Sequence, residues 1–494
     1  MSNTTTGLRI GWAQTDITPD RPVLVTGQFH ARVSEGVMDP VTATALAIES
    51  LADAQPPPGG VMVSCDLVAI PDGLRDAVRE HVRRRLPELD PMTVFLHATH
   101  THAAPEIRVE SDALQLGGGM VPARLGVDLD VMEPAQYLAF ASPRIADTVA
   151  RAWTSRAPGG IGFGLGQAVV GHNRRITYYD GATRMYGNTD DPNFSHVEGY
   201  EDHSVNMLAT WDAERRLTGL VVNVACPSQV SEQSFLLSAD YWHDTREELR
   251  RRLGAELFVL AQNSAAGDQS PHLLLNKRAE ERMWRLEGRT QRQDIAIRIA
   301  DAVTAVLPHV EREVAWNPPF AHRVETVELT RRLLTERDVR DAQAEADKLR
   351  QQYDALRRDL EAHPEKRREP RWYTGITAAY RMMKWNEGVG ERYRRQQAQP
   401  KIPIEVHALR LGDVAMATNP FEYYLDFGMQ IKARSKAVQT FLIQHTGSGT
   451  YLPTQRAISG KSYGAVPAST PVGPEGGREL VEETLRLLNG LWDD

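Results

Sequence analysis

Apolar and polar residues alternate in short runs from residue 8 to about residue 330, which predicts strands separated by amphipathic helices. The predicted strands lie at residues 60–64, 93–98, 220–225 and 257–262, and the predicted helices at residues 72–85 and 245–253. Asp244, with Glu247 three residues later, is typical of the N-terminal cap of the second helix. This order predicts an α/β fold, with candidate site residues gathered where the strands end.

Residues 335–400 follow a different pattern. Thr335 and Asp338 predict the start of a helix whose apolar residues recur at alternating spacings of three and four. These residues are Val339, Ala342, Ala346, Leu349, Tyr353, Leu356 and Leu360. After His363-Pro364 and a basic run, a second helical stretch carries Ile376, Ala379, Tyr380 and Met383. We expect an inserted antiparallel helical hairpin, and three roles stay open: a packed structural arm, a contact between two copies of the chain, or a lid.

The last part of the chain returns to the earlier pattern, with strand-like runs at residues 404–411 and 414–418. An amphipathic helix is predicted over residues 478–491. We therefore expect one large α/β domain made of residues 1–334 and 401–494, with residues 335–400 as its helical arm.

Composition and charge exclude several classes of protein. The chain has 494 residues, of which 41% are hydrophobic and 25% are charged, as in ordinary globular proteins. The formal net charge of −8 argues against a nucleic acid or an anionic membrane surface as the main partner. Two cysteines give no disulfide framework, residues 1–6 lack the features of a secretory signal, and no apolar run approaches the roughly 20 residues of a membrane span. We expect a cytoplasmic protein.

Two histidines directly after a predicted strand form the clearest candidate site. The sequence Thr-His-Thr-His-Ala-Ala-Pro at residues 99–105 places His100 and His102 one residue apart, where a strand gives way to a loop. Neutral imidazole is the commonest metal ligand, and zinc sites gather such side chains from several loops. The pair alone is a weak indication, because histidines in hydrogen bonds are common.

A second loop supports the first. The sequence Gly-Asp-Gln-Ser-Pro at residues 267–271 follows the predicted strand at 257–262 and could present Ser270 as an exposed nucleophile. The simpler interpretation is a turn serine whose hydroxyl bonds to its own backbone.

These two motifs resemble the catalytic domain of the neutral ceramidase family, which carries a Thr-His-Thr-His-Ser-Gly-Pro motif and a Gly-Asp-x-Ser-Pro motif. Further similar segments occur in the family's order: Asp-Ile-Thr-Pro at 16–19, Gly27, Asn173-Arg174, Asn-Pro-Phe-Glu at 419–422, Tyr-Leu-Pro-Thr at 451–454, and Tyr463. The resemblance covers most of the chain. It predicts a divergent member without the family's C-terminal immunoglobulin-like domain.

The resemblance implies a zinc-dependent hydrolase that cleaves an amide (N-acyl) bond of a small, lipid-like substrate. It implies zinc ligands at His100, Glu422 and Tyr451, a nucleophile at Ser270, and roles in orienting substrate or stabilising charge for His102, Arg174 and Tyr463. Gly27 is implied as a substrate contact, and Asp268 is expected beside the substrate, mainly holding the serine loop. Whether Arg174 or the adjacent Arg175 lines the site stays open.

The chain also departs from the family. The family has a second zinc histidine after a central strand, whereas here the strand at 220–225 is followed by Cys226. Thiolate is a good zinc ligand, so Cys226 could replace that histidine, and His243 in the next loop is an alternative. His272 stands where the family usually has asparagine. The substrate therefore need not be ceramide.

Two other functions remain open at this point. A zinc hydroxide could itself attack an ester, a lactone or a glycosidic bond. Alternatively, the chain could be a non-catalytic binding protein that acts through its helical arm, and copies of the chain could associate through that arm.

Overall fold

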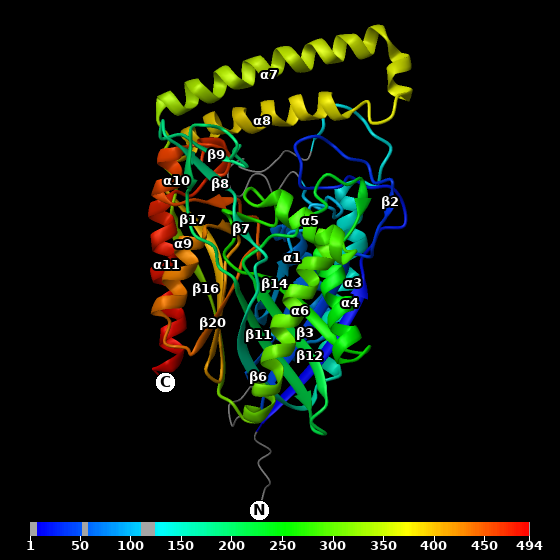
Figure 1. The fold of residues 1–494 in the computed structure, drawn as a ribbon, viewed down its shortest axis with the longest axis vertical. Coiled ribbons are helices and arrows are strands. Elements are labelled where there is room, and N and C mark those ends of the chain that lie inside the picture. The colour runs from blue at the N-terminus through cyan, green and yellow to red at the C-terminus, as the bar shows by residue number, and fades with distance from the viewer. Residues whose placement is uncertain (1–6, 52–57, 110–123, 494) are drawn as a thin grey trace, which may run out of the picture.

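Two β-sheets lie face to face, with helices on both outer sides, in this computed structural model (Figure 1). The structure describes residues 7–51, 58–109 and 124–493. Residues 1–6, on which the expected lack of a secretory signal rests, lie outside the described residues. The predicted α/β class is confirmed, and its layers run helix, sheet, sheet, helix.

The larger sheet has the strand order β14-β12-β11-β6-β1-β3-β4-β5. Its strands are β1 (Leu8–Asp16), β3 (Thr42–Ser50), β4 (Gly59–Cys65), β5 (Val94–Ala98), β6 (Ala157–Gln167), β11 (Ser204–Asp212), β12 (Leu217–Val224) and β14 (Phe258–Asn263). The pairs β4–β5 and β12–β14 are parallel, and the pairs between them are antiparallel. The sheet is therefore mixed, although strands and helices alternate along much of the sequence.

The smaller sheet has the order β16-β17-β18-β20. It consists of β16 (Phe320–Thr330), β17 (Lys401–Leu411), β18 (Val414–Thr418) and β20 (Gln439–Ile443). Short strands also pair with one another in the loops. Three of these pairs are β2 (Gly36–Val37) with β13 (Leu236–Leu237), β7 (His172–Asn173) with β15 (Gln269–Ser270), and β19 (Glu422–Tyr423) with β21 (Tyr451–Leu452). In addition, β8 (Arg175–Tyr178) pairs with both β9 (Thr183–Met185) and β10 (Phe194–Val197).

Helices cover the outer face of each sheet. The larger sheet is covered by α1 (Asp72–Arg85), α3 (Pro134–Thr154), α4 (Tyr241–Leu253) and α6 (Gln291–Val310). The smaller sheet is covered by α9 (Leu425–Arg434) and α11 (Pro474–Asn489), and α5 (Lys277–Glu287) and α10 (Gln455–Gly460) are peripheral. No helix in the described ranges is both long and apolar enough to cross a membrane.

The period of two along the strands explains why both faces of the larger sheet are buried. On β3, Ala43, Ala45 and Ala47 pack under the helices, while Leu46 and Ile48 face the second sheet. The small side chains fill the layer between the sheet and its helices, and the large side chains fill the layer between the two sheets, so each layer is packed by residues of matching size.

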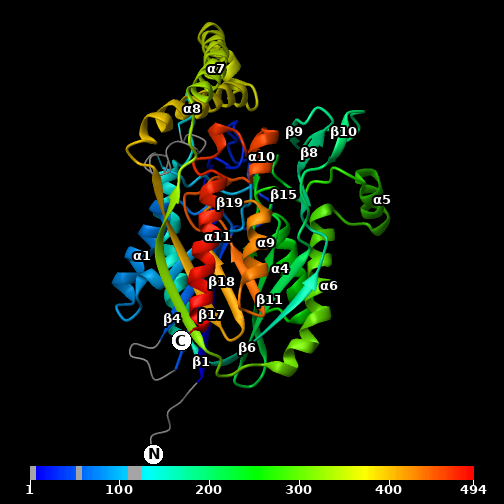
Figure 2. The same ribbon diagram turned by 90° about the vertical axis from the view of Figure 1, so that its left-hand side faces the viewer.

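The predicted helical hairpin is confirmed as α7 (Glu336–Ala362) and α8 (Thr374–Arg395), which are joined through the 3-10 helix η3 (Pro364–Arg368). Thr335 caps α7 with Asp338, as the sequence predicted. The rings of Tyr353 and Tyr380 lie 5.2 Å apart between the two helices. Figure 2 shows both helices lying across one end of the body. An association of copies through this arm stays a prediction.

One predicted helix boundary was wrong. Helix α4 begins at Tyr241 rather than after Asp244, and Asp240 is its N-cap, with a side-chain oxygen that accepts from the backbone N–H of Tyr241. Asp244 instead accepts a hydrogen bond of 2.7 Å from Arg292. The residue that the sequence predicted as the cap therefore lies one turn inside the helix, where it forms a partly buried ion pair.

A buried ion pair joins α4 to the larger sheet and provides a test of the fold. Asp66 accepts hydrogen bonds of 2.8 and 2.9 Å from Arg246, and both side chains are almost fully buried. Asp66→Ala leaves the guanidinium without its partner, so we expect the free energy of unfolding to fall by about 3–5 kcal/mol in urea titrations. Glu482→Ala, which breaks an exposed pair with Arg434, is the control and should have little effect. Equal effects of the two variants would contradict this prediction.

Candidate active site

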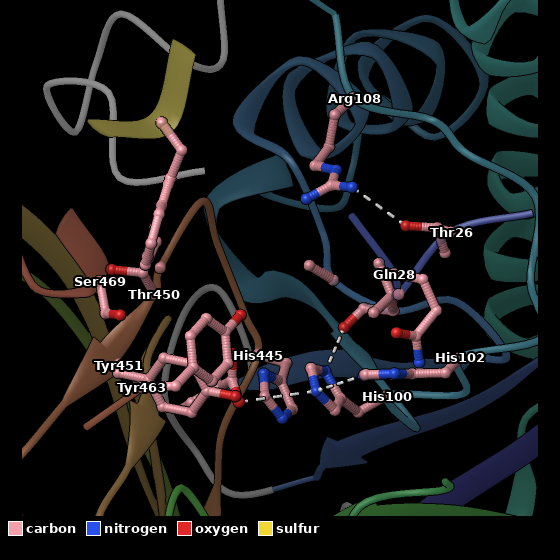
Figure 3. Close-up of a pocket in the computed structure, with 16 residues that line it drawn as sticks. Thr26, Gln28, His100, His102, Arg108, His445, Thr450, Tyr451, Tyr463 and Ser469 are labelled. Atoms are coloured by element: carbon pink, nitrogen blue, oxygen red, sulfur yellow. Dashed lines mark hydrogen bonds and ion pairs between the residues drawn. The ribbon is translucent and has the colours of Figure 1, made fainter. Parts of the chain in front are cut away.

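Six residues singled out in the sequence line one cavity of about 90 Å³ (Figure 3). They are Gly27, His100, His102, Glu422, Tyr451 and Tyr463. They come from loops far apart in the chain, at the end of β5, at β19 and at β21. The structure therefore brings together most of the predicted site.

The two motif histidines are held in a constrained loop. Strand β5 ends at Ala98, and His100 has φ 59°, a left-handed conformation that residues other than glycine rarely adopt. His445 has φ 63°, and its ring stacks on that of His100 with 4.1 Å between centroids. Such strained positions are found mainly at functional sites, where the surrounding structure enforces them.

Hydrogen bonds determine which nitrogen of each histidine faces the cavity. Nδ1 of His100 lies 2.6 Å from the carbonyl oxygen of Val68, which can only accept, so Nδ1 carries the proton. Nδ1 of His102 lies 3.4 Å from Oε2 of Glu232, which favours the same tautomer. The two Nε2 atoms then lie 3.2 Å apart, and that of His102 also accepts a hydrogen bond from the side-chain amide of Gln229. Burial lowers the pKa of both histidines, so both rings are neutral and a shared proton is disfavoured.

The carboxylate and the phenol are placed by a short pair of parallel strands. Glu422 on β19 pairs with Tyr451 on β21, which sets the two side chains beside each other. Oε2 of Glu422 lies 3.7 Å from Nε2 of His100. Burial raises the pKa of Glu422 to about 7 and raises the pKa of Tyr451 well above its usual value.

The donor set of this cavity suits a divalent cation. Two neutral imidazole nitrogens, a carboxylate and a phenol oxygen lie close together in this cavity. Each offers a lone pair or a negative charge, and a bound cation would remove the repulsion between them. In the part of the chain that the structure describes, no three histidine, cysteine, aspartate or glutamate side chains form a metal-binding group by themselves. His100 and Glu422 would need a further ligand of another type to hold zinc, and the hydroxyl of Tyr451 in the same cavity could supply it.

Arg174, and not Arg175, belongs to this site. Its Nη2 lies 3.3 Å from the hydroxyl of Tyr451 and 3.5 Å from Oε2 of Glu422. The side chain of Arg175 points away and donates to Oε1 of Glu198 at 2.9 Å. Neither arginine lines the cavity itself, and Arg174 is the one that contacts two of its lining residues.

Ser270 lies next to the cavity rather than on its wall. Its side chain is fully buried, whereas the sequence predicted an exposed serine. Oγ accepts hydrogen bonds from the hydroxyl of Tyr186 at 3.2 Å and from the backbone N–H of His272 at 3.1 Å. Arg174 donates to the same Tyr186 hydroxyl at 3.0 Å, so Ser270 is joined to the site through Tyr186.

Asp268 holds the serine loop and does not contact the cavity. Its carboxylate accepts from Asn173 at 2.9 Å and from the backbone N–H of Leu425 at 3.0 Å, and it is almost fully buried. Its expected place beside the substrate is not supported, because these bonds turn the side chain away from the cavity. Gly267 permits the close packing of this loop, since a Cβ there would lie 2.2 Å from the carbonyl oxygen of Glu422.

Neither candidate for the missing zinc histidine reaches the cavity. Cys226 packs in the hydrophobic cluster under α4 and α6, with Sγ 3.6 Å from the carbonyl oxygen of Val170. Burial raises the pKa of this thiol, which disfavours the thiolate that zinc requires. His243 lies on the first turn of α4 and does not line the cavity.

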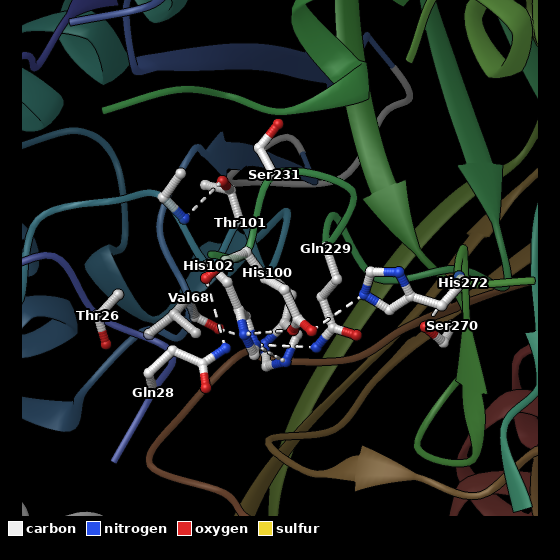
Figure 4. Close-up of polar contacts among 12 residues, drawn as sticks. Thr26, Gln28, Val68, His100, Thr101, His102, Gln229, Ser231, Ser270 and His272 are labelled. Atoms are coloured by element: carbon white, nitrogen blue, oxygen red, sulfur yellow. Dashed lines mark hydrogen bonds and ion pairs between the residues drawn. The ribbon is translucent and has the colours of Figure 1, made fainter. Parts of the chain in front are cut away.

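Several polar residues around the site were not singled out in the sequence, among them Gln229, which Figure 4 shows beside His102. Gln229 donates to Nε2 of His102 at 2.9 Å, and its Oε1 accepts from Arg174 at 3.2 Å. Glu232 bridges His102 and His272, with Oε1 3.0 Å from Nε2 of His272. Burial alone would raise the pKa of Glu232, but hydrogen bonds from these histidines hold it well below its usual range.

Another missed residue is His445, which lines the cavity two residues after the end of strand β20. A general search for polar residues after predicted strands could have found His445 and Gln229. Glu232 would not have been found in this way, because it lies further from the end of the preceding strand.

Gly27 provides a sharp test of the site geometry. It has φ +101°, and a Cβ at this position would lie 2.5 Å from Cγ of His102. Gly27→Ala should displace the imidazole, so we expect activity to fall about 10²-fold. Gly181→Ala is the matched control, because Gly181 has φ +81° but open space around it. The control should lose only about 1 kcal/mol of stability and no activity. Equal activity of both variants would show that the contact with His102 does not matter.

Comparisons with known proteins bear on the fold of the chain. No model of a known protein family matches the chain, and no curated protein matches it either. Among solved structures, it is similar to the neutral ceramidase from Pseudomonas aeruginosa, with a TM-score of 0.68 and 15% identity over 99% of this chain and 75% of that one. It is also similar to a structure described as a ceramidase complexed with C2, with a TM-score of 0.67 and 14% identity over 99% of this chain and 76% of that one. The chain has a neutral ceramidase-like fold.

Proposed function

We propose that this protein is a zinc-dependent hydrolase that cleaves an amide bond of a small N-acylated substrate, with Ser270 as nucleophile. The observation that carries the proposal is that His100, Glu422 and Tyr451 line one cavity and lie beside one another there. The ceramidase-like fold supports it, because the same fold in a protein named as a ceramidase is compatible with hydrolysis of an N-acyl bond.

His100, Glu422 and Tyr451 would hold the metal, and Nε2 of His102 is directed at the same point. When bound, zinc supplies a Lewis acid that polarises a carbonyl and lowers the pKa of coordinated water. The hydrogen bond from His100 to Val68 fixes the orientation of that ring, as partners of metal-binding histidines generally do.

The remaining residues would act on the substrate. Ser270 would attack the amide carbonyl, form an ester with the acyl group and release the amine, and water would then hydrolyse the ester. His102, fixed between Gln229 and Glu232, offers a neutral acceptor nitrogen for proton transfer. Arg174 and Tyr463 would stabilise negative charge on the carbonyl oxygen.

One observation favours a second candidate function. Ser270 is fully buried and is not part of the cavity wall, whereas the candidate metal ligands are. Direct attack by water would need no serine at that wall, and it would suit an ester, a lactone or a glycosidic substrate.

Metal analysis combined with a substrate screen tests the proposal. Purified protein should contain zinc, lose hydrolysis when a chelator removes the metal, and regain it when zinc is returned. The screen should compare N-acyl, ester and sugar-derived compounds. Turnover of esters or sugars alone would favour the second candidate, and no zinc-dependent turnover of any compound would contradict both.

A further inference from the structure

One wall of the cavity comes from the helical arm. Trp385 on α8 lines the cavity together with residues of the body, although its position in the sequence lies inside the inserted hairpin. The ring of Trp385 contacts Phe29 at 5.2 Å between centroids and Tyr463 at 5.8 Å. Tyr463 in turn lies 5.4 Å from the ring of Tyr451. An aromatic chain thus connects the arm to a candidate metal ligand.

Helix α8 is fastened to the loop that forms the neighbouring wall. The hydroxyl oxygen of Thr377 accepts from the backbone N–H of Ala31 at 2.9 Å, and that of Tyr373 accepts from the backbone N–H of Val33 at 3.0 Å. Both bonds join α8 to the segment that continues from Gly27, a cavity-lining residue. Trp385 is 9% exposed and therefore well packed. This wall is a fixed part of the site.

The cavity is small and partly open. A volume of about 90 Å³ is well below the roughly 300–1,000 Å³ of pockets that hold drug-sized ligands. Polar side chains also stand on the walls away from the candidate ligands, namely Thr26, Gln28, Thr450 and Ser469. A long alkyl chain would place these groups against hydrocarbon, which is unfavourable unless they keep hydrogen bonds.

We infer that the site takes a compact N-acyl substrate with an acyl group of a few carbons, and that Trp385 is the residue that limits the length of this group. The inference rests on the hydrolase function proposed above and names its substrate class. It assigns the arm a role in substrate selection.

A chain-length series measures this limit. The substrates are N-acetyl-, N-butyryl-, N-octanoyl- and N-dodecanoylethanolamine, so only the acyl group changes, and the released amine is measured. For the wild type, we expect kcat/KM to fall at least about 100-fold from acetyl to dodecanoyl, the scale of a few misfitting methylene groups. Trp385→Ala should raise the octanoyl-to-acetyl ratio at least about tenfold.

Two further variants separate selection from folding. Trp385→Phe keeps an aromatic wall and should keep the wild-type preference. Trp372→Ala removes a tryptophan of the arm that does not line the cavity, and it should also leave the preference unchanged. If Trp385→Ala does not fold, Trp385→Leu is the replacement, and it should relax the limit in the same direction.

Binding gives a readout that does not depend on hydrolysis. Calorimetry with the Ser270→Ala variant should show binding of the acetyl compound at least about tenfold tighter than that of the dodecanoyl compound. If no amide is hydrolysed but this difference persists, the proposed function fails and the size limit stands. If dodecanoyl and acetyl compounds are hydrolysed equally well, the size limit is overturned and the function stands. Weaker turnover of all lengths alike in Trp385→Ala would also overturn it.

Discussion

Ser270→Ala is expected to lower kcat for amide hydrolysis by at least about 10³-fold while the bound metal is retained. The reason is that removing the nucleophile of a covalent mechanism removes the step itself, and such losses are typically of this size or larger. Metal content should not change, because Oγ of Ser270 bonds to Tyr186 and to the backbone of His272 and not to the candidate ligands. Steady-state kinetics and metal analysis of the same preparation measure both quantities.

The control is Ser264→Ala in the segment that precedes the same loop. Ser264 is also buried, and its hydroxyl has no hydrogen-bond partner among the described residues, so its loss should leave kcat nearly unchanged. If Ser270→Ala costs only about tenfold to a hundredfold, the scale of a lost hydrogen bond, water attacks directly and the second candidate function is favoured. Such a result would leave the fold and the metal site unaffected.

His100→Ala is expected to remove the metal almost completely, from about one zinc per chain to nearly none. Nε2 of His100 lies within 4 Å of both the Nε2 of His102 and the carboxylate of Glu422. Removing it therefore takes away the central ligand of the proposed metal site. Turnover should then fall to the level of the chelated wild type. Atomic absorption after dialysis measures the zinc content.

Two controls address the ligands that the sequence suggested. Cys226→Ala and His243→Ala should keep full metal content, because neither side chain lines the cavity. Loss of zinc in Cys226→Ala would mean that this loop rearranges when metal binds. Full zinc content in His100→Ala would contradict the proposed site.

The sequence predicted the elements well wherever local pattern was decisive. Helix α1 and strand β18 lie at the predicted residues, and α7 begins at the predicted cap. These elements were readable because apolar periodicity and capping are local properties. Helix α4 began earlier than predicted because Asp240 caps it, while Asp244 pairs with Arg292 of α6, which is distant in sequence.

Site residues were predictable to the extent that a short motif carried them. His100, Glu422 and Tyr451 belong to segments that resemble a known family, and the structure places all three on one cavity. Cys226 was suggested because it occupies the position after a strand, but its direction into the core depends on how α4 and α6 pack there. The side of the sheet that a residue faces at a strand end is decided by packing, and the sequence alone does not show it.

By itself, the sequence determined the α/β class, the helical hairpin, the two histidines and the absence of a basic surface charge, because each depends on residues close together in the chain or on composition. Only the tertiary structure decided that His445, Gln229 and Glu232 join the site, that Arg174 rather than Arg175 contacts Tyr451, and that Trp385 lines the cavity. These residues come from segments up to several hundred positions apart, so no local sequence pattern predicts that they lie together. Their contacts arise when two sheets and an inserted arm bury their apolar faces together, which is a property of the whole chain.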